Sequence, residues 1–83
     1  MILNCAIIDD EPLAAGLLKS YVEKTPFLSL SGVYNSALAA MKDLRENPVH
    51  LIFLDIQMPE LSGVEFAKIL PKETKVIFTT AFS

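Results

Sequence analysis

Short apolar runs recur four times along the chain, each bounded by polar or turn-forming residues. The first run is nearly continuous and includes β-branched residues, whereas the second alternates apolar with small or polar positions. Runs of this length with either pattern are typical of β-strands. We therefore predict strands over Leu3–Ile8, Leu28–Tyr34, Val49–Leu54 and Lys75–Thr80.

Between these runs, apolar residues recur at intervals of three and four, which is the spacing of one helix face. In the first interval Pro12 suits a first helical turn, and Thr25-Pro26 marks the end of the helix. We expect the Leu, Met and Tyr residues of these helices to pack in the core. The series are Leu13, Leu17 and Tyr21 with Ala14, Leu18 and Val22, then Leu38, Met41 and Leu44, then Val64, Ala67 and Leu70.

The predicted order of elements is βαβαβαβ, with connections long enough for right-handed crossovers. This order indicates an α/β fold with a doubly wound parallel sheet. The 83 residues form at most one domain, spanning 1–83, and 52% of them are hydrophobic, as suits strands covered on both faces. The last strand would be expected to lead into another helix, so we expect the domain to be incomplete.

The overall charge and the single cysteine exclude several classes of protein. The net charge is -3 with the basic residues scattered, so this segment is not expected to bind nucleic acid directly. Cys5 lies in an apolar strand, which favours a buried packing role over a reactive thiol. No apolar stretch approaches the roughly 18 residues of a membrane span, and no secretory leader is recognisable. We therefore expect a cytoplasmic protein that does not contact the membrane.

Acidic residues stand where predicted strands end. Asp9 and Asp10 follow the first strand, and Asp55 follows the third. The carboxyl ends of parallel strands lie along one edge of the sheet, so these three carboxylates should converge. Their mutual repulsion calls for a proton or a cation. Because oxygen ligands suit Mg²⁺ and softer ligands are scarce, we predict a magnesium site there.

With a cation present, one carboxylate could act as a nucleophile toward phosphorus. Asp55 is the best candidate, since it ends the most apolar strand and leads into a loop. Thr80, at the end of the fourth predicted strand, could donate a hydrogen bond to an acquired phosphoryl group.

Each of these residues also has a purely structural interpretation. Asp10 or Glu11 could cap the first helix, and Asp55 could simply form a turn. Thr80 could be an ordinary β-forming residue. Capping explains one acidic position and leaves the others unexplained, so their joint occurrence favours a site. His50 begins its strand, at the opposite edge from Asp55, which favours a surface or packing role.

Four motifs closely resemble the receiver domain of bacterial two-component response regulators, a flavodoxin-like fold. The first and last are similar to those of receivers that precede LytTR-type DNA-binding domains. The motifs are Ile7-Ile8-Asp9-Asp10-Glu11-Pro12, Leu54-Asp55-Ile56-Gln57-Met58-Pro59, Ser62-Gly63 and Phe78-Thr79-Thr80-Ala81.

The resemblance implies a phosphoacceptor that is not a turnover enzyme. Asp55 would accept a phosphoryl group from a sensor histidine kinase, and the output would be transcriptional control by a domain outside this segment. Asp10 and Asp55 would bind Mg²⁺, with Asp9 acting partly through water and the Gln57 carbonyl completing the protein ligands. Thr80 would be the switch hydroxyl. By strand alternation, Thr79 would point to the other face.

The sequence departs from the family at its C-terminal end. Receivers carry a further helix, a fifth strand with a lysine that pairs with the phosphoryl group, and a last helix, none of which is present. Lys75 cannot replace that lysine, because it begins its strand on the order of 15 Å from the carboxyl edge. We therefore expect weak phosphorylation and an unpaired fourth-strand edge open to self-association.

Two alternative functions remain open at this point. The first is a receiver-like interaction module that is never phosphorylated. The second is an aspartyl-phosphate hydrolase, which is less favoured because Gln57 stands where such hydrolases have a second Asp.

Overall fold

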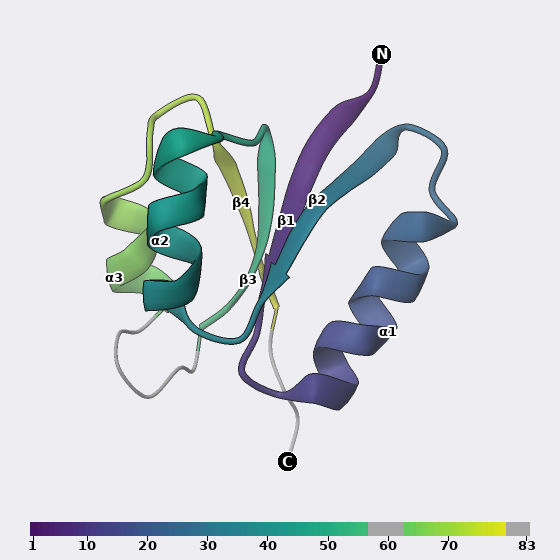
Figure 1. Cartoon of the computed structure of the whole chain (residues 1–83), viewed down its shortest axis with the longest axis horizontal. Helices are drawn as coiled ribbons and strands as arrows, with labels where there is room; N and C mark the ends of the chain where they lie inside the picture. Colours follow the sequence, from purple (N-terminus) through teal and green to yellow (C-terminus); the bar gives the residue numbers. More distant parts are fainter. Residues whose placement is uncertain (57–62, 80–83) are drawn as a thin grey trace.

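A single parallel sheet forms the centre of the molecule (Figure 1). The computed structural model describes residues 1–56 and 63–79. In these ranges the strands run in the order β2-β1-β3-β4, and every neighbouring pair is parallel. Their bounds are β1 Leu3–Ile8, β2 Leu28–Tyr34, β3 Leu51–Asp55 and β4 Lys75–Thr79.

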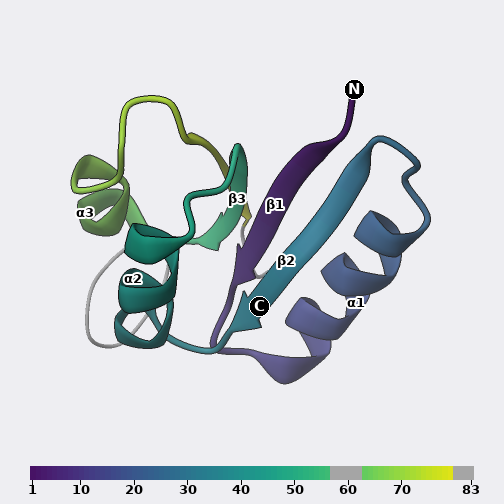
Figure 2. The same cartoon turned by 45° about the horizontal axis from the view of Figure 1, so that its top comes forward.

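The helices lie on both faces of this sheet, as Figures 1 and 2 show. Helix α1 (Pro12–Glu23) covers one face, and α2 (Ala37–Glu46) and α3 (Gly63–Lys68) cover the other. The element order is βαβαβαβ, which confirms the predicted α/β fold with a doubly wound parallel sheet. Among the described residues no helix is long and apolar enough to cross a membrane.

Each face of the sheet has its own apolar core, and β1 contributes to both. Ile8 packs on the side of α2 and α3, together with the fully buried Phe66. Cys5 and Ile7 pack on the side of α1. Burying a side chain the size of Ile or Phe stabilises the fold by about 1.5–3 kcal/mol. Because both faces are covered, β1 is a nearly continuous apolar run. Burial also raises the pKa of the Cys5 thiol, in agreement with its predicted packing role.

Local signals in the sequence fix the ends of the helices. Glu11 is the N-cap of α1, and its carboxylate accepts a hydrogen bond from the Leu13 N–H at 3.2 Å. Ser36 caps α2 by accepting from the Ala39 N–H at 3.0 Å. The hydroxyl of Thr25 donates to the Tyr21 carbonyl at 2.7 Å, just after α1 ends. These contacts satisfy backbone groups that a helix leaves open at its termini.

The prediction that the apolar series of α1 pack in the core was confirmed for Leu18 and Val22 and wrong for the other series. Leu13, Leu17 and Tyr21 are 84%, 54% and 57% exposed, and Leu38 on α2 is also exposed. Helix α1 contacts the sheet through Leu18 and Val22, together with Ala15, which was not predicted. The apolar surface of α1 is wider than the strip that touches the sheet, and apolar spacing alone did not tell the two faces apart.

Two strand boundaries differ slightly from those predicted. β3 begins at Leu51 instead of Val49, although Val49 is buried and its carbonyl accepts a hydrogen bond from the Thr74 hydroxyl at 2.9 Å. Val49 therefore packs as a core residue of the loop that enters β3. The described part of β4 ends at Thr79, and Thr80 lies outside the described residues.

Gly32 allows the ring of Tyr34 to lie across β2. A Cβ at position 32 would stand 2.7 Å from the Tyr34 hydroxyl oxygen and 2.9 Å from its Cζ. That hydroxyl donates to the Asp43 carboxylate on α2 at 2.9 Å, which joins the strand to the helix. By contrast, a Cβ on Gly16 in α1 would meet no atom within 4 Å.

We predict that Gly32→Ala displaces the Tyr34 ring, breaks its hydrogen bond to Asp43 and lowers the free energy of unfolding by about 1 kcal/mol. Gly16→Ala is the matched control and should stabilise the protein by roughly 0.5–1 kcal/mol, because it replaces a helical glycine in open space. Urea unfolding followed by circular dichroism measures both. Equal stability of wild type and Gly32→Ala would contradict the packing described for Tyr34.

Candidate metal and phosphoacceptor site

The carboxyl ends of β1 and β3 lie side by side and bring their acidic residues together. Ile8 is in register with Leu54, so Asp9 and Asp55, the residues that follow them, occupy adjacent positions. One carboxylate oxygen from each of Asp9, Asp10 and Asp55 lies within 4.8 Å of the others. The convergence of these three side chains was predicted from the sequence, and the structure places them as predicted.

Asp9 is the most constrained of the three carboxylates. It is 5% exposed, and one of its oxygens accepts a hydrogen bond from the Glu11 N–H at 2.8 Å. Its own N–H donates to the Tyr34 carbonyl at 3.0 Å, which fixes the end of β1 against β2. The pKa of Asp9 is raised, chiefly by burial and also by the charges of Asp55 and Asp10 and a hydrogen bond shared with Asp55. The Glu11 N–H opposes this shift only in part.

Asp55 is held by the strand that carries it. It is the last residue of β3, directly after the apolar residues Leu51 to Leu54, and it is 4% exposed. The strand therefore fixes the backbone of Asp55. Its carboxylate has little contact with water, and this low exposure strengthens its interactions with nearby charges.

Asp10 differs from the other two because it is exposed at the mouth of the site. The sequence left open whether Asp10 or Glu11 caps α1. In the structure Glu11 takes the capping role, so the cap does not account for Asp10.

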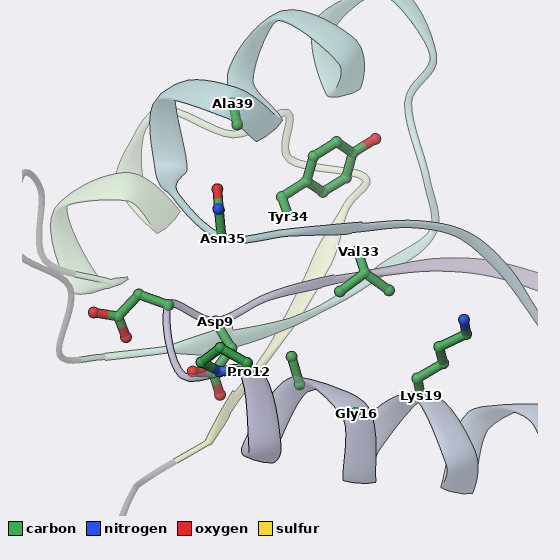
Figure 3. A pocket seen from close by; sticks show the side chains of 10 residues that line it. Asp9, Pro12, Gly16, Lys19, Val33, Tyr34, Asn35 and Ala39 are labelled. Carbon is green, nitrogen blue, oxygen red and sulfur yellow. The ribbon is translucent and has the colours of Figure 1, made fainter.

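A hollow of about 550 Å³ extends from the acidic residues along α1 and β2 (Figure 3). Asp9 and Asp10 line one end, and Val33 and Tyr34 belong to its β2 wall. Lys19 lines the other end, two helical turns along α1 from Pro12. Lys19 was not predicted as a site residue, because its position in the sequence does not indicate that its side chain faces this hollow.

The donor set fits Mg²⁺. This ion takes hard oxygen ligands at about 2.1 Å, so two of its ligands are at most about 4.2 Å apart. Carboxylate oxygens within 4.8 Å of one another need only a small adjustment or an intervening water. A cation would also relieve the repulsion that raises the pKa of Asp9. Gln57 and Thr80, the other predicted site residues, lie outside the described residues.

Thr79 is paired with Asp55 in the β3–β4 ladder. It is the β4 residue in register with Asp55, and the Ile56 N–H donates to its carbonyl at 3.5 Å. Residues in register on adjacent parallel strands place their side chains on the same face. Thr79 therefore shares the face of Asp55. The expectation that Thr79 faces opposite to Thr80 stays a prediction, because Thr80 lies outside the described residues.

His50 has the structural role that its position suggested. It is exposed just before β3, its Nδ1 accepts from the Asn4 N–H at 2.9 Å, and its N–H donates to the Asn4 carbonyl at 2.9 Å. These bonds tie the start of β3 to β1, at the opposite end of both strands from the acidic cluster.

Comparison with known proteins agrees with the fold. The chain belongs to the response regulator receiver domain family, which it matches over residues 5–83. It is thus a receiver domain of the two-component response regulators, a signalling class.

Relatives of the chain carry names from the same class. An uncharacterized response regulatory protein of Shewanella oneidensis is 34% identical over 82 residues, covering 96% of this chain and 35% of that protein. The transcriptional regulatory protein BtsR of Escherichia coli K12 is 32% identical over 82 residues. The sensory transduction protein LytT of Bacillus anthracis is 34% identical over 83 residues, and the chain covers 34% of it.

Solved receiver structures share the fold. The response regulator domain of Thermotoga maritima CheB superposes with a TM-score of 0.86 at 26% identity, covering 96% of this chain and 61% of that one. The isolated receiver of RcsB from Salmonella enterica gives a TM-score of 0.88 at 20% identity, covering 62% of that chain. The present chain thus spans about a third of its curated relatives and about three fifths of these solved receivers.

We predict that Asp9→Asn stabilises the metal-free protein at neutral pH, because it removes one of the clustered charges. The pKa of Asp9 is raised in the folded state, so the wild type loses stability as the pH rises through that value, whereas the variant does not. An increase in Tm of roughly 4 °C corresponds to about 1 kcal/mol in a domain of this size.

The same variant should show a smaller rise in Tm on addition of Mg²⁺, because a ligand has been weakened. Differential scanning calorimetry with and without Mg²⁺ measures both effects, with Glu46→Gln, an exposed acid at the end of α2, as the control. A lower Tm for Asp9→Asn than for the wild type without Mg²⁺ would contradict the claim that repulsion among the three carboxylates destabilises the metal-free protein.

Proposed function

We propose that this chain is the phosphoacceptor part of a two-component response regulator and that a sensor histidine kinase phosphorylates it on Asp55 in a Mg²⁺-dependent reaction. The observation that carries the proposal is the convergence of Asp9, Asp10 and Asp55 within 4.8 Å, in a chain that belongs to the receiver family. Residues 1–83 would form the N-terminal part of the receiver domain. The role is that of a signalling phosphoacceptor and not of a turnover enzyme.

The chemistry assigned to Asp55 is nucleophilic attack on phosphorus. A carboxylate oxygen of Asp55 forms the new P–O bond while the P–N bond of a phosphohistidine breaks, and the imidazole nitrogen keeps the electron pair of that bond. Bound Mg²⁺ would supply charge compensation for the transferring oxygens. The nearby Asp9 and Asp10 would bind the ion together with Asp55. The bound cation would stabilise the ionised form of all three carboxylates.

The proposed output is regulation of transcription from the cytoplasm, through a part of the protein that is not in this chain. BtsR is named a transcriptional regulatory protein, and RcsB has been solved bound to promoter DNA. We propose an output domain of the LytTR type from the resemblance of the first and last motifs, and one relative is named the sensory transduction protein LytT. The net charge of -3 argues against direct binding of DNA by this segment.

Partners other than the kinase follow from the sheet. In the described part of the chain β4 is an outermost strand, and its Ile77 and Phe78 are 47% and 44% exposed. We propose self-association through this edge.

We predict Mg²⁺-dependent modification of Asp55 by small phosphodonors. With acetyl phosphate, intact mass spectrometry should show addition of one phosphoryl group, and with beryllofluoride the amide NMR signals around Asp55 should shift. RcsB was solved with the same phosphomimetic, so beryllofluoride is a suitable probe for the fold.

Asp55→Asn should abolish both responses, whereas Glu46→Gln should leave them unchanged. Modification that persists in Asp55→Asn would refute the assigned acceptor. If the wild type gave no Mg²⁺-dependent response at all, the chain would be better described as an interaction module that is not phosphorylated. Steady turnover of p-nitrophenyl phosphate that depends on Asp55 would indicate a hydrolase instead.

The two neighbouring threonines offer a second test. Thr80 is the proposed switch hydroxyl, and Thr79 is in register with Asp55. We predict that Thr80→Ala reduces the beryllofluoride-induced NMR shifts several-fold while Thr79→Ala leaves most of them. The reverse result would assign the hydroxyl to Thr79.

A further inference from the structure

Asp9 is held by two hydrogen bonds that come from different parts of the chain. The Glu11 N–H donates to its carboxylate at 2.8 Å, and its own N–H donates to the Tyr34 carbonyl at 3.0 Å. The first bond belongs to the turn that leads into α1. The second depends on β2, because Tyr34 is the last residue of that strand. The end of β2 therefore helps to determine where the Asp9 backbone lies.

The β1–β2 ladder alone holds this end of β2 weakly. In the described part of the chain β2 is an outermost strand, which pairs with β1. The ladder shifts register between Cys5 and Ala6 and skips Ser31, so the last three residues of β2 are separated from the rest of the strand. Short segments at the edge of a sheet open locally at low cost in free energy. A further contact is needed to hold the Tyr34 carbonyl in place.

The side chain of Tyr34 makes such a contact with α2. Its ring lies across Gly32, which has no Cβ to displace it, and its hydroxyl donates to the Asp43 carboxylate at 2.9 Å. Burial, the hydrogen bond to Asp43 and the charge of Asp43 raise the pKa of the Tyr34 phenol, so the hydroxyl stays protonated at neutral pH. In Figure 3 the ring extends away from Asp9, on the side of the sheet where Ala39 lies.

We propose that Tyr34 is a positioning residue for Asp9. Its side chain fastens the end of β2 to Asp43 on α2, and its carbonyl holds the backbone of Asp9. We call these two bonds together the Tyr34 tether. Tyr34 acts on the bound ion through Asp9, because the bonds that support a metal ligand fix its orientation.

This inference rests on the Mg²⁺ site proposed above and extends it to α2. The tether couples the position of α2 to the binding of the ion. Because coupling between two equilibria is reciprocal, bound Mg²⁺ should in turn strengthen the hydrogen bond between Tyr34 and Asp43.

Loss of the tether should weaken the site without abolishing it. The hydrogen bond from the Glu11 N–H to the Asp9 carboxylate remains when the Tyr34 hydroxyl is removed. Removing a group that directly supports a metal ligand lowers metal affinity by about 10–100-fold. The Tyr34 hydroxyl acts one step further away, so we expect a loss of roughly three- to ten-fold.

Amide hydrogen exchange in the Mg²⁺-free 83-residue chain tests the tether directly. Tyr34→Phe removes the hydroxyl and keeps the ring. The reference is the Leu3 N–H, which donates to the Phe27 carbonyl at the other end of the same strand pair. The Asp9 N–H should exchange about five-fold faster in the variant, relative to Leu3, which is the factor expected for the loss of one hydrogen bond.

The ratio of the two amides separates a local effect from a general loss of stability, which would speed both equally. Tyr21→Phe is the matched control, because Tyr21 is 57% exposed on α1 and should leave the ratio unchanged. An unchanged ratio in Tyr34→Phe would overturn the proposal.

NMR titration with Mg²⁺ tests the effect on the site. Tyr34→Phe and Asp43→Ala should each weaken binding by roughly three- to ten-fold. The double variant should bind no more weakly than the weaker of the two single variants, because both substitutions break the same bond. Tyr21→Phe should bind like the wild type. So should Glu46→Gln, which removes a different exposed charge from α2.

Val22→Ala distinguishes positioning from stability. Val22 is buried on the α1 side of the sheet, so this variant loses core packing and keeps the tether. It should bind Mg²⁺ like the wild type. A loss of affinity as large as that of Tyr34→Phe would show that stability alone explains the effect and would overturn the proposal.

The two measurements also distinguish this inference from the proposed metal site. Equal Mg²⁺ affinity in the wild type and Tyr34→Phe would leave the site intact and refute the role of Tyr34. A wild type that binds no Mg²⁺ would refute the site, and the exchange ratio would then decide whether Tyr34 positions Asp9.

Discussion

The parallel pairing of β1 with β3 is the constraint on which the site depends. These strands are adjacent in space although more than forty residues separate them in sequence, and their register sets Asp9 beside Asp55. Apolar residues of both strands are buried on the two faces of the sheet, so neither strand can slip by one residue without exposing its core side chains. The energy of core packing therefore holds like charges together that would otherwise separate.

The cost of this arrangement is visible at Asp9. Its pKa is raised by burial and by the neighbouring carboxylates, although the Glu11 N–H stabilises its charged form. Because the carboxylates repel one another, binding of a cation or a change in charge at Asp55 would alter the electrostatic energy of all three. Lys19 lies at the far end of the adjoining hollow.

Much of the fold could be predicted because its signals are local. Apolar runs and helical spacing predicted the positions of the strands and helices. The convergence of Asp9, Asp10 and Asp55 could be predicted because the carboxyl ends of parallel strands lie along one edge. The exposure of Leu13, Leu17 and Tyr21 could not be predicted in the same way. Apolar spacing gives a helix an apolar surface, but the neighbours that are present decide which strip of it is buried, and here Ala15, Leu18 and Val22 make the contact.

Register was the other property that the sequence left undetermined. Alternation along β4 relates Thr79 to Thr80, but it does not say which of them stands beside Asp55, since that depends on how β4 is aligned with β3. The alignment of β4 with β3 places Thr79 opposite Asp55, and neither the apolar pattern of β4 nor its length specifies that alignment. A shift of one residue in this ladder would turn the side chain paired with Asp55 to the other face of the sheet. The surroundings of the phosphoacceptor candidate therefore depend on long-range strand pairing, which a local sequence pattern does not encode.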